Sequence, residues 1–443
     1  MEELCQSPSC CKRHPRSPRC RSAAGVGERQ ALPEGSAAPS DAPALHHRAK
    51  HVEQQTLEWV CARAAQARSG ASCARCGWWT PRALVTAAPK LLPQALATTV
   101  WMLCVAKPTP ADGQLSSRHL ELATAAVASA RLHAPSLAPY VLYLHRPAQE
   151  LRADDPFTRR LHALGARVVP HRLSFYEHIP TSKLTGGSQK HLNFGAFGRL
   201  DIPLVVESLR PELRQRGLDV ERVLYTDTDV LFAADFDAST RARYAPLKYF
   251  AVGSEVFSPT LNSGVMYLNV SAMATEWPGM LEYAKRRHFK FHLMDQTLLR
   301  DWFETSRCQR CKSLRRKHQK VRRRLSPVLD VLDDATYNAR GFIHPIEPSA
   351  RDSSRIIHPH IWHWHGYKPH DVSCWMSAIQ SGKWPAESWL DHPVRGTGCR
   401  YFDAISMGSC YLRTYVYLLV QHKELIRFAS TFGVPMAMQN RTS

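Results

Sequence analysis

The run VLYTDTDVLF at residues 223–232 joins a short apolar segment to two closely spaced carboxylates. Asp227 and Asp229 follow the predicted strand Val223–Tyr225, so we expect them at the carboxyl edge of a sheet, where open α/β sheets bind ligands. Side chains at i and i+2 of an extended segment share a face, so both carboxylates can reach one cation. Their oxygens suit Mn²⁺ or Mg²⁺, which bridge such groups to phosphate oxygens. The alternative is a pair of surface aspartates that only caps a strand.

The segments around this run predict an α/β fold with a mostly parallel central sheet and flanking helices. Apolar stretches typical of strands lie at 98–106, 140–144, 166–169, 223–225, 249–252, 265–270 and 356–364. Helical patterns lie at 116–130, 156–165, 195–209, 280–287, 295–303 and 411–428. Strands that alternate with helices indicate parallel neighbours joined by right-handed crossovers. Within 195–209, Pro203 is expected to bend or restart the helix.

Three regions are expected along the chain. Residues 1–93 are a basic, low-complexity head that is rich in Pro, Ala, Arg and Ser, and we expect it to be disordered. Residues 94–370 form the α/β domain, with a basic insertion at about 305–326. Residues 371–443 are predicted to be a C-terminal helical extension packed on that domain.

Four further motifs accompany TDTD in a consistent order. They are GAFGRLDIP at 195–203, LNSGVMYLNV at 261–270, MDQTL at 294–298 and HWHGYKP at 363–369. Together the five segments resemble the motifs of the glycogenin-like family (family 8) of GT-A-fold glycosyltransferases. The resemblance implies a GT-A, Rossmann-like nucleotide-diphospho-sugar transferase fold over about 98–370. It also implies a Mn²⁺ (or Mg²⁺) cofactor, a UDP-sugar donor and transfer of a hexose with retention.

The same resemblance implies a metal site with three protein ligands. His363 would join Asp227 and Asp229 as the third ligand, through a neutral imidazole. Five histidines lie between residues 358 and 370, so His365 is an alternative third ligand.

Charged residues from two motifs are predicted to hold the nucleotide-sugar. Lys368 would place its charge against the diphosphate, and Gly366 would let the backbone approach, although this chain has one residue fewer between them than the family's commonest form. Otherwise Lys368 is an exposed loop lysine. Arg199 would reach the nucleotide or diphosphate, and Asp201 would hold Arg199 or a sugar hydroxyl. Alternatively, Arg199 and Asp201 are a surface pair whose side chains do not meet.

Two motifs are predicted to contact the transferred sugar. Asn262 offers a donor and acceptors to a sugar hydroxyl, and Gly264 would allow close approach behind the sugar, unless Asn-Ser-Gly is simply a turn. The family resemblance puts Asp295 and Gln296 near the anomeric carbon, whereas Asp295 alone could be a helix N-cap. Asn262, Asp295 and Gln296 are therefore the candidate catalytic residues.

The excess of positive charge is confined to two segments. Of the formal net charge of +20, residues 1–90 carry +6 and residues 307–324 carry +10, which leaves +4 for the other 335 residues. This distribution argues against nucleic-acid binding as the main function. The segment 307–324 is interpreted as a solvated insertion, with peripheral contact to an anionic surface as the alternative.

The predicted partners are therefore a nucleotide-sugar and an acceptor that is a glycan, a protein or a small molecule. Other interpretations are a catalytically inactive relative that binds nucleotide-sugar or glycan, and a basic nucleic-acid-binding protein built around 307–324. A nucleotidyltransferase is a third, but it needs a Gly-rich phosphate loop, which KPTPADGQ at 107–114 does not supply.

Cysteines and hydropathy leave the compartment open. The pairs Cys73/Cys76 and Cys308/Cys311 have a spacing that zinc sites use, but they lie far apart in unlike contexts. One disulfide among Cys374, Cys399 and Cys410 is an option if the enzyme is luminal. No apolar stretch reaches the length of a membrane span. The family resemblance favours the Golgi or secretory lumen, with the cytoplasm or another organelle as alternatives.

Overall fold

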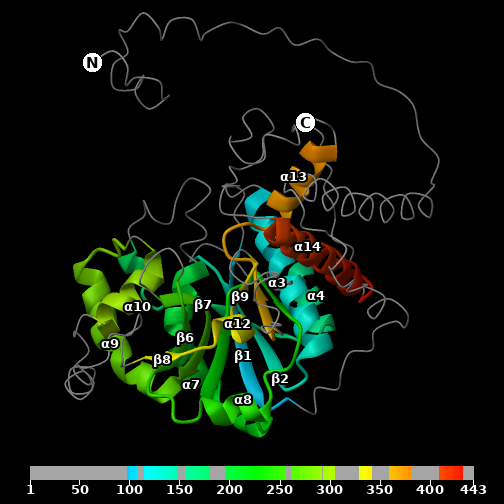
Figure 1. The fold of residues 1–443 in the computed structure, drawn as a ribbon. Coiled ribbons are helices and arrows are strands. Elements are labelled where there is room, and N and C mark those ends of the chain that lie inside the picture. Colours follow the sequence, from blue (N-terminus) through cyan, green and yellow to red (C-terminus); the bar gives the residue numbers. More distant parts are fainter. Residues whose placement is uncertain are drawn as a thin grey trace, which may run out of the picture. The chain divides into compact units, whose positions relative to one another are not determined.

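A seven-stranded sheet with helices on both faces forms the core of the protein (Figure 1). The structure, a computed structural model, describes residues 97–107, 114–146, 155–179, 195–255, 261–291, 293–304, 329–341, 359–380 and 409–432. The strands of this sheet are β1 (Thr99–Ala106), β2 (Leu137–Leu144), β3 (Arg167–His171), β4 (Asp219–Thr226), β6 (Phe250–Ser254), β7 (Leu261–Asn269) and β8 (Asp330–Val331). Their order is β3-β2-β1-β4-β7-β6-β8, and β7 runs antiparallel to both of its neighbours while the other strands share one direction. The predicted α/β class, with a mostly parallel central sheet and flanking helices, is confirmed.

The helices form one layer on each face of the sheet. Helices α3 (Gln114–His133), α4 (Pro156–Ala163) and α14 (Ser409–Ser430) contribute to one hydrophobic cluster, and α7 (Ile202–Gln215), α9 (Val270–Arg286) and α10 (Met294–Glu304) contribute to the other. The other described helical elements are η6 (Tyr176–His178), η7 (Gly198–Asp201), α8 (Ala238–Arg243), α12 (Asp334–Tyr337) and α13 (Pro369–Gln380).

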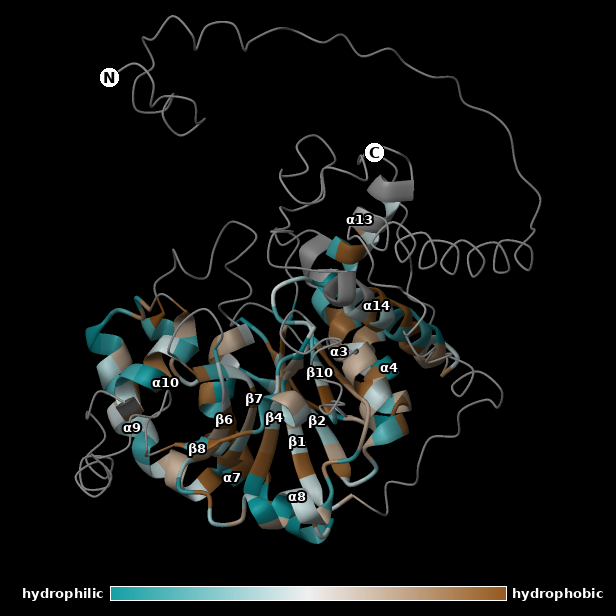
Figure 2. Cartoon of the chain, in the orientation of Figure 1, coloured by the Kyte–Doolittle hydropathy of each residue, from teal (hydrophilic) through white to brown (hydrophobic). Residues whose placement is uncertain are grey.

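Strand β1 is almost entirely apolar because both of its faces are covered. Trp101, Leu103 and Val105 pack into the cluster that contains α3, while Val100 and Met102 pack into the cluster that contains α7. Each of these side chains is at most 1% exposed. A strand that is covered on both faces has no polar side to show, so its sequence is mostly apolar, and much of β1 is brown in Figure 2.

A second, three-stranded sheet connects segments that are distant in sequence. Strand β10 (Ile361–His363) lies between β5 (Val230–Phe232) and β9 (Ala339–Arg340), antiparallel to β5 and parallel to β9. In the β5 pairing, His363 lies opposite Val230, directly after the TDTD run. The backbone pairing therefore determines which histidine reaches the aspartates.

Two local interpretations need correction. Asn262, Ser263 and Gly264 lie inside β7, so the alternative of a turn at this point is wrong. The helix expected at 280–287 begins ten residues earlier, because the Asn269 side chain caps Val270–Arg286 by accepting from Ala272 N. Pro278 inside this helix does not end it, since apolar side chains on both sides of the proline remain buried against the sheet.

The C-terminal part of the described chain packs on the same domain. Helix α14 lies against α3, and Trp364 contacts Tyr415 with ring centroids 5.6 Å apart. Cys374 in α13 is disulfide-bonded. Among the described helices, none combines the length and apolar character that spanning a bilayer requires. The head 1–93, the basic segment 307–324 and both CxxC pairs lie outside the described residues.

Candidate functional site

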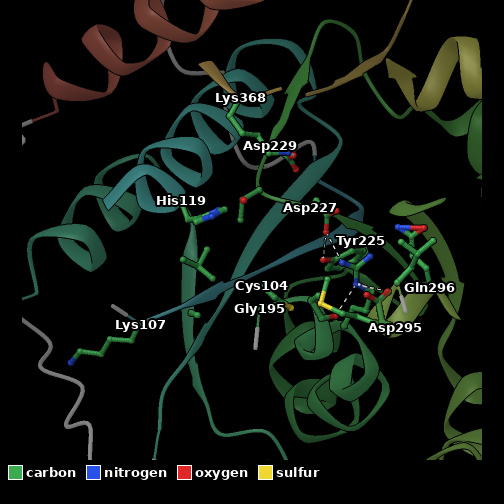
Figure 3. A pocket seen from close by; sticks show the side chains of 17 residues that line it. Cys104, Lys107, His119, Gly195, Tyr225, Asp227, Asp229, Asp295, Gln296 and Lys368 are labelled. Carbon is green, nitrogen blue, oxygen red and sulfur yellow. Dashed lines mark hydrogen bonds and ion pairs between the residues drawn. The ribbon is translucent and has the colours of Figure 1, made fainter. Parts of the chain in front are cut away.

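The order in which strands are added to the sheet reverses between β1 and β4. From β1 it moves outward through β2 to β3, and it then returns to place β4 on the other side of β1. Ligands of open α/β sheets bind at the carboxyl ends of the strands at such a switch point. A cavity of about 260 Å³ lies there, lined by Cys104–Lys107 at the end of β1 and by Tyr225, Asp227 and Asp229 at the end of β4 (Figure 3).

Asp227, Asp229 and His363 come together beside this cavity. One ligand atom from each lies within 4.8 Å of the other two. His363 Nε2 is 4.0 Å from Asp227 Oδ2 and 3.6 Å from Asp229 Oδ1. Two atoms that each lie about 2.1 Å from a shared ion are about 3–4 Å apart, so these separations fit one divalent cation. The oxygen and imidazole donors suit Mn²⁺ or Mg²⁺ better than a thiolate-seeking metal.

The other oxygen of each carboxylate is bonded to a different part of the chain. Asp227 Oδ1 accepts from Arg199 Nη2 at 2.8 Å and from the Tyr225 hydroxyl at 2.7 Å. Asp229 Oδ2 accepts from Lys368 Nζ. The oxygen of each aspartate that bonds to these side chains is called its outer oxygen. The other, inner oxygen faces His363.

Lys368 reaches the cavity despite the short spacing of its motif. Its Nζ also donates to Trp364 O at 2.9 Å, and Gly366 adopts φ +86°, a left-handed turn that glycine makes without strain. Burial alone would raise the pKa of the Asp229 carboxyl, but Lys368 and His363 outweigh burial and hold that pKa well below its usual range. Lys368 is therefore part of the site rather than an exposed loop lysine.

Arg199 connects the TDTD run to the DQ segment. Its Nε lies 3.2 Å from Asp295 Oδ2, and its Nη1 donates to Ser263 Oγ at 2.6 Å. Ser263 Oγ donates in turn to Asp295 Oδ2 at 2.7 Å. Burial raises the pKa of Asp295 to about 6, with Arg199 opposing that shift. Burial also disfavours the Arg199 charge, but Asp227 and Asp295 outweigh it and raise the pKa of the guanidinium above its usual value.

Two residues of this network were not singled out from the sequence. The guanidinium of Arg199 lies 4.7 Å from the centre of the Tyr225 ring, at cation–π distance. Tyr225 is two residues before Asp227, so the period of a strand could have placed both on one face. Ser263 lies in the LNSGV motif, but nothing in that motif indicates that its hydroxyl bonds to both Arg199 and Asp295.

Asp201 is not where the sequence placed it. Its carboxylate accepts from Ser174 N and Ser174 Oγ, both at 2.7 Å, and contacts His171 Nε2 at 2.9 Å. The Asp201 side chain is 0% exposed and does not line the cavity. The prediction that Asp201 holds Arg199 is wrong. The two side chains do not meet, as the alternative expected, but neither lies on the surface, because both residues are buried. Asp201 instead fastens η7 to the segment after β3.

Asn262 and Gly264 act behind the histidine rather than at the cavity wall. Asn262 is 1% exposed and does not line the cavity. Its Oδ1 accepts from Asn338 Nδ2 at 3.1 Å, and its Nδ2 donates to Glu255 Oε2 at 2.9 Å. A Cβ on Gly264 would lie 2.1 Å from His363 Cε1. Glycine is therefore required here by the close approach of the imidazole.

His363, and not His365, points at the aspartates. His363 Nδ1 contacts Asn338 Oδ1 at 2.8 Å, which leaves Nε2 on the side of the carboxylates. His365 Nε2 lies 3.4 Å from Glu255 Oε2 instead. Burial is the main cause that lowers the pKa of His365 well below its usual value. The alternative third ligand is therefore turned to another partner.

Asp295 and Gln296 line the cavity from the start of α10 (Figure 3). Gln296 Oε1 is buried and has no hydrogen-bond partner among the residues that the structure describes. A buried acceptor without a partner is costly, so this oxygen is suited to accept from a ligand hydroxyl. Asp295 is the second residue of α10 and its carboxylate accepts from Ser263 Oγ, so the alternative of a simple N-cap is not supported.

Comparisons with known proteins give similar solved structures. No protein-family model and no curated protein matches the chain. Apo GlyE of Streptococcus pneumoniae TIGR4 is 17% identical, with 61% of this chain and 57% of GlyE covered and a TM-score of 0.36. Galactosyltransferase LgtC, solved with donor and acceptor sugar analogues, is 13% identical over 66% of this chain and 96% of LgtC, with a TM-score of 0.40. Mouse xyloside xylosyltransferase 1 is 14% identical over 61% and 98%, with a TM-score of 0.33.

Proposed function

We propose that this protein is a metal-dependent glycosyltransferase that moves a hexose from a UDP-sugar to an acceptor hydroxyl. The observation that carries the proposal is the convergence of Asp227, Asp229 and His363 on one point beside the switch-point cavity. The three residues come from the end of β4 and from β10, segments more than a hundred residues apart. A chance pair of surface aspartates would not meet a buried histidine in this way.

The residues around the proposed metal site suit a departing diphosphate. A Mn²⁺ or Mg²⁺ ion held by Asp227, Asp229 and His363 would neutralise negative charge on the phosphates. Lys368 lies next to Asp229, so its ammonium is within reach of the same phosphates. Fixed positive charge at the point where negative charge develops is the most effective form of electrostatic stabilisation.

The opposite wall of the cavity suits the sugar. Gln296 Oε1 is free to accept from a sugar hydroxyl, and the Asp295 carboxylate is held in place by Arg199 and Ser263. Arg199 lines the cavity and bonds to Asp227 and Asp295, so we propose that it fixes these two carboxylates as well as contacting the nucleotide. Retention of the anomeric configuration is proposed from the motif resemblance. The acceptor is proposed to be a glycan, a protein or a small molecule.

The test is UDP release from a panel of UDP-sugars, with and without Mn²⁺, by the wild type and by Asp229→Ala. We expect release from one donor in the presence of Mn²⁺ and a loss of at least about a hundredfold in the variant, on the scale of removing a key electrostatic stabiliser. Asp237→Ala is the matched control, because Asp237 is an exposed N-cap of α8 away from the cavity. Full activity in Asp229→Ala would contradict the proposed site. Mn²⁺-dependent UDP binding without any turnover would identify a catalytically inactive relative.

A further inference from the structure

A chain of buried amide side chains extends behind the proposed metal site. His363 Nδ1 contacts Asn338 Oδ1 at 2.8 Å, and Asn338 Nδ2 donates to Asn262 Oδ1 at 3.1 Å. Asn338 follows the short helix α12, whereas Asn262 lies in β7. The three side chains belong to residues that are 0%, 2% and 1% exposed for Asn338, His363 and Asn262, so water does not compete for these bonds.

The donor and the acceptor of each hydrogen bond in this series of side chains follow from the groups at the end of the series. Gly264 N is a backbone donor and lies 3.2 Å from one Asn262 side-chain atom, so that atom must be the oxygen. The other Asn262 atom contacts the Glu255 carboxylate at 2.9 Å, so it must be the nitrogen. The orientation of Asn262 is fixed by partners that can play only one role.

The same reasoning fixes Asn338. Its Nδ2 faces two acceptors, Asn262 Oδ1 at 3.1 Å and Asp334 Oδ1 at 3.4 Å. A reversed amide would point its oxygen at both of these oxygens, which would be repulsive in a buried site. Asp334 is itself held, because its Oδ2 accepts from Ser254 N at 3.0 Å. Asn338 Oδ1 must therefore face His363 as an acceptor.

We propose that Asn338 is a positioning residue that keeps the hydrogen of a neutral His363 on Nδ1 and aims the bare Nε2 at Asp227 and Asp229. An acceptor at 2.8 Å from Nδ1 requires a donor there, so the lone pair of the ring is left on Nε2. Nε2 is the ring nitrogen that faces the two carboxylates, at 4.0 and 3.6 Å. The inference rests on the proposed function, because it assigns Asn338 a role in preparing the third ligand of the proposed cation site.

The His363 ring is held on one side by Asn338 and on the other side by Gly264. The ring lies against the Gly264 backbone, where a Cβ would approach Nε2 to 2.8 Å. The amide therefore sets the rotation of the ring, and the glycine sets how far the ring can move toward β7. Outer partners of this kind typically change metal affinity by about 10- to 100-fold when they are removed.

The test compares wild type with Asn338→Leu, which keeps the approximate volume and removes the acceptor. The first readout is the tautomer of His363 in metal-free protein labelled with ¹⁵N-histidine, at a pH where imidazole is neutral, with the resonance assigned by its loss in His363→Gln. We expect the wild type to carry the hydrogen on Nδ1 and Asn338→Leu to lose this preference. The second readout is Mn²⁺ affinity from the electron paramagnetic resonance of the free ion, which we expect to weaken about 10- to 100-fold.

Asp333→Ala is the control for simple loosening of α12. Asp333 caps this helix by accepting from Ala335 N at 3.2 Å and Thr336 Oγ1 at 2.8 Å, without contacting His363. It should lower thermal stability and leave both the tautomer and the Mn²⁺ affinity unchanged.

The outcomes separate this inference from the proposed function. A wild-type hydrogen on Nε2, or unchanged Mn²⁺ affinity in folded Asn338→Leu, would overturn the role of Asn338 alone. A wild type that binds no Mn²⁺ would overturn the proposed function and this inference together. If Asn338→Leu does not fold, the wild-type tautomer decides, since it needs no variant at position 338.

Discussion

Gly264→Ala is expected to disable the proposed metal site through a single methyl group. The new Cβ would lie 2.1 Å from His363 Cε1, 2.8 Å from Nε2 and 2.9 Å from Nδ1. Ordinary contact between such atoms needs about 3.5 Å or more. Neither group can move freely, because Gly264 O accepts from Asp227 N at 2.7 Å and the ring bonds to Asn338.

The size of the effect follows from these distances. The ring has to shift by more than about 1 Å, whereas metal ligands tolerate deviations of about 0.2 Å. His363 would then no longer share an ion with the aspartates, and we expect Mn²⁺ affinity to fall by at least about tenfold, as when a supporting partner is lost. Overpacking of a buried site typically costs about 1–3 kcal/mol, and the free energy of unfolding should fall by that amount.

The assay is Mn²⁺ titration combined with urea unfolding of Gly264→Ala and of the control Gly195→Ala, which would meet no atom within 4 Å. We expect the control to match the wild type in both measurements. In a His363→Ala background the ring is absent, so Gly264→Ala should cost less stability there than in the wild type, with a coupling of about 0.5–3 kcal/mol. Unchanged Mn²⁺ affinity and unchanged stability in Gly264→Ala would refute the steric reasoning.

Arg199→Met removes the only bonded cation that Asp227 and Asp295 share in the described network. It should lower the free energy of unfolding in urea titrations by about 3–5 kcal/mol, because buried carboxylates lose their partner. An unchanged unfolding midpoint in this variant would contradict the prediction. Burial lowers the pKa of His422 in α14 from 6.5 to about 4, so the folded protein keeps it neutral while the unfolded chain takes up a proton below about pH 6.5. Its contribution to stability is therefore complete above that pH and is lost as the pH falls, by about 2 kcal/mol between pH 7 and pH 5, and His422→Leu should remove this part of the pH dependence in urea unfolding.

The parts of the fold that the sequence predicts are those with a local cause. Strand β1 is apolar because it is covered on both faces. Helix α7 starts directly before Pro203 because proline lacks the N–H that a residue inside a helix would donate. The position of Asp227 and Asp229 was also predictable, because carboxylates that directly follow a buried strand must lie at the edge of its sheet. Each of these inferences needs only a few neighbouring residues.

The errors concern residues whose role depends on a partner far away in the sequence. Asp201 lies in a motif with Arg199, yet it bonds to Ser174 because η7 turns its side chain toward β3. Gly264 is required by His363, ninety-nine positions later, because a Cβ would clash with the imidazole. Asn338 lies between β8 and β9 without any recognisable pattern, so only the register of β9 and β10 reveals that it meets the histidine.

The charges of the site make a consistent case for a cation that accompanies the diphosphate. The formal charges of Asp227, Asp229 and Asp295 are three negative and those of Arg199 and Lys368 are two positive, so these five groups have a formal net charge of about −1. Alone they would repel a nucleoside diphosphate. A divalent cation between the inner oxygens would change the sign to about +1 and make the same groups attract it. The bonds that Arg199 and Lys368 make to Asp227 and Asp229 go to the outer oxygens, so the two aspartates lie side by side and their inner oxygens still face His363. The positions of the candidate ligand atoms therefore depend on the residues that hold Asp227, Asp229 and His363 as much as on these three residues themselves.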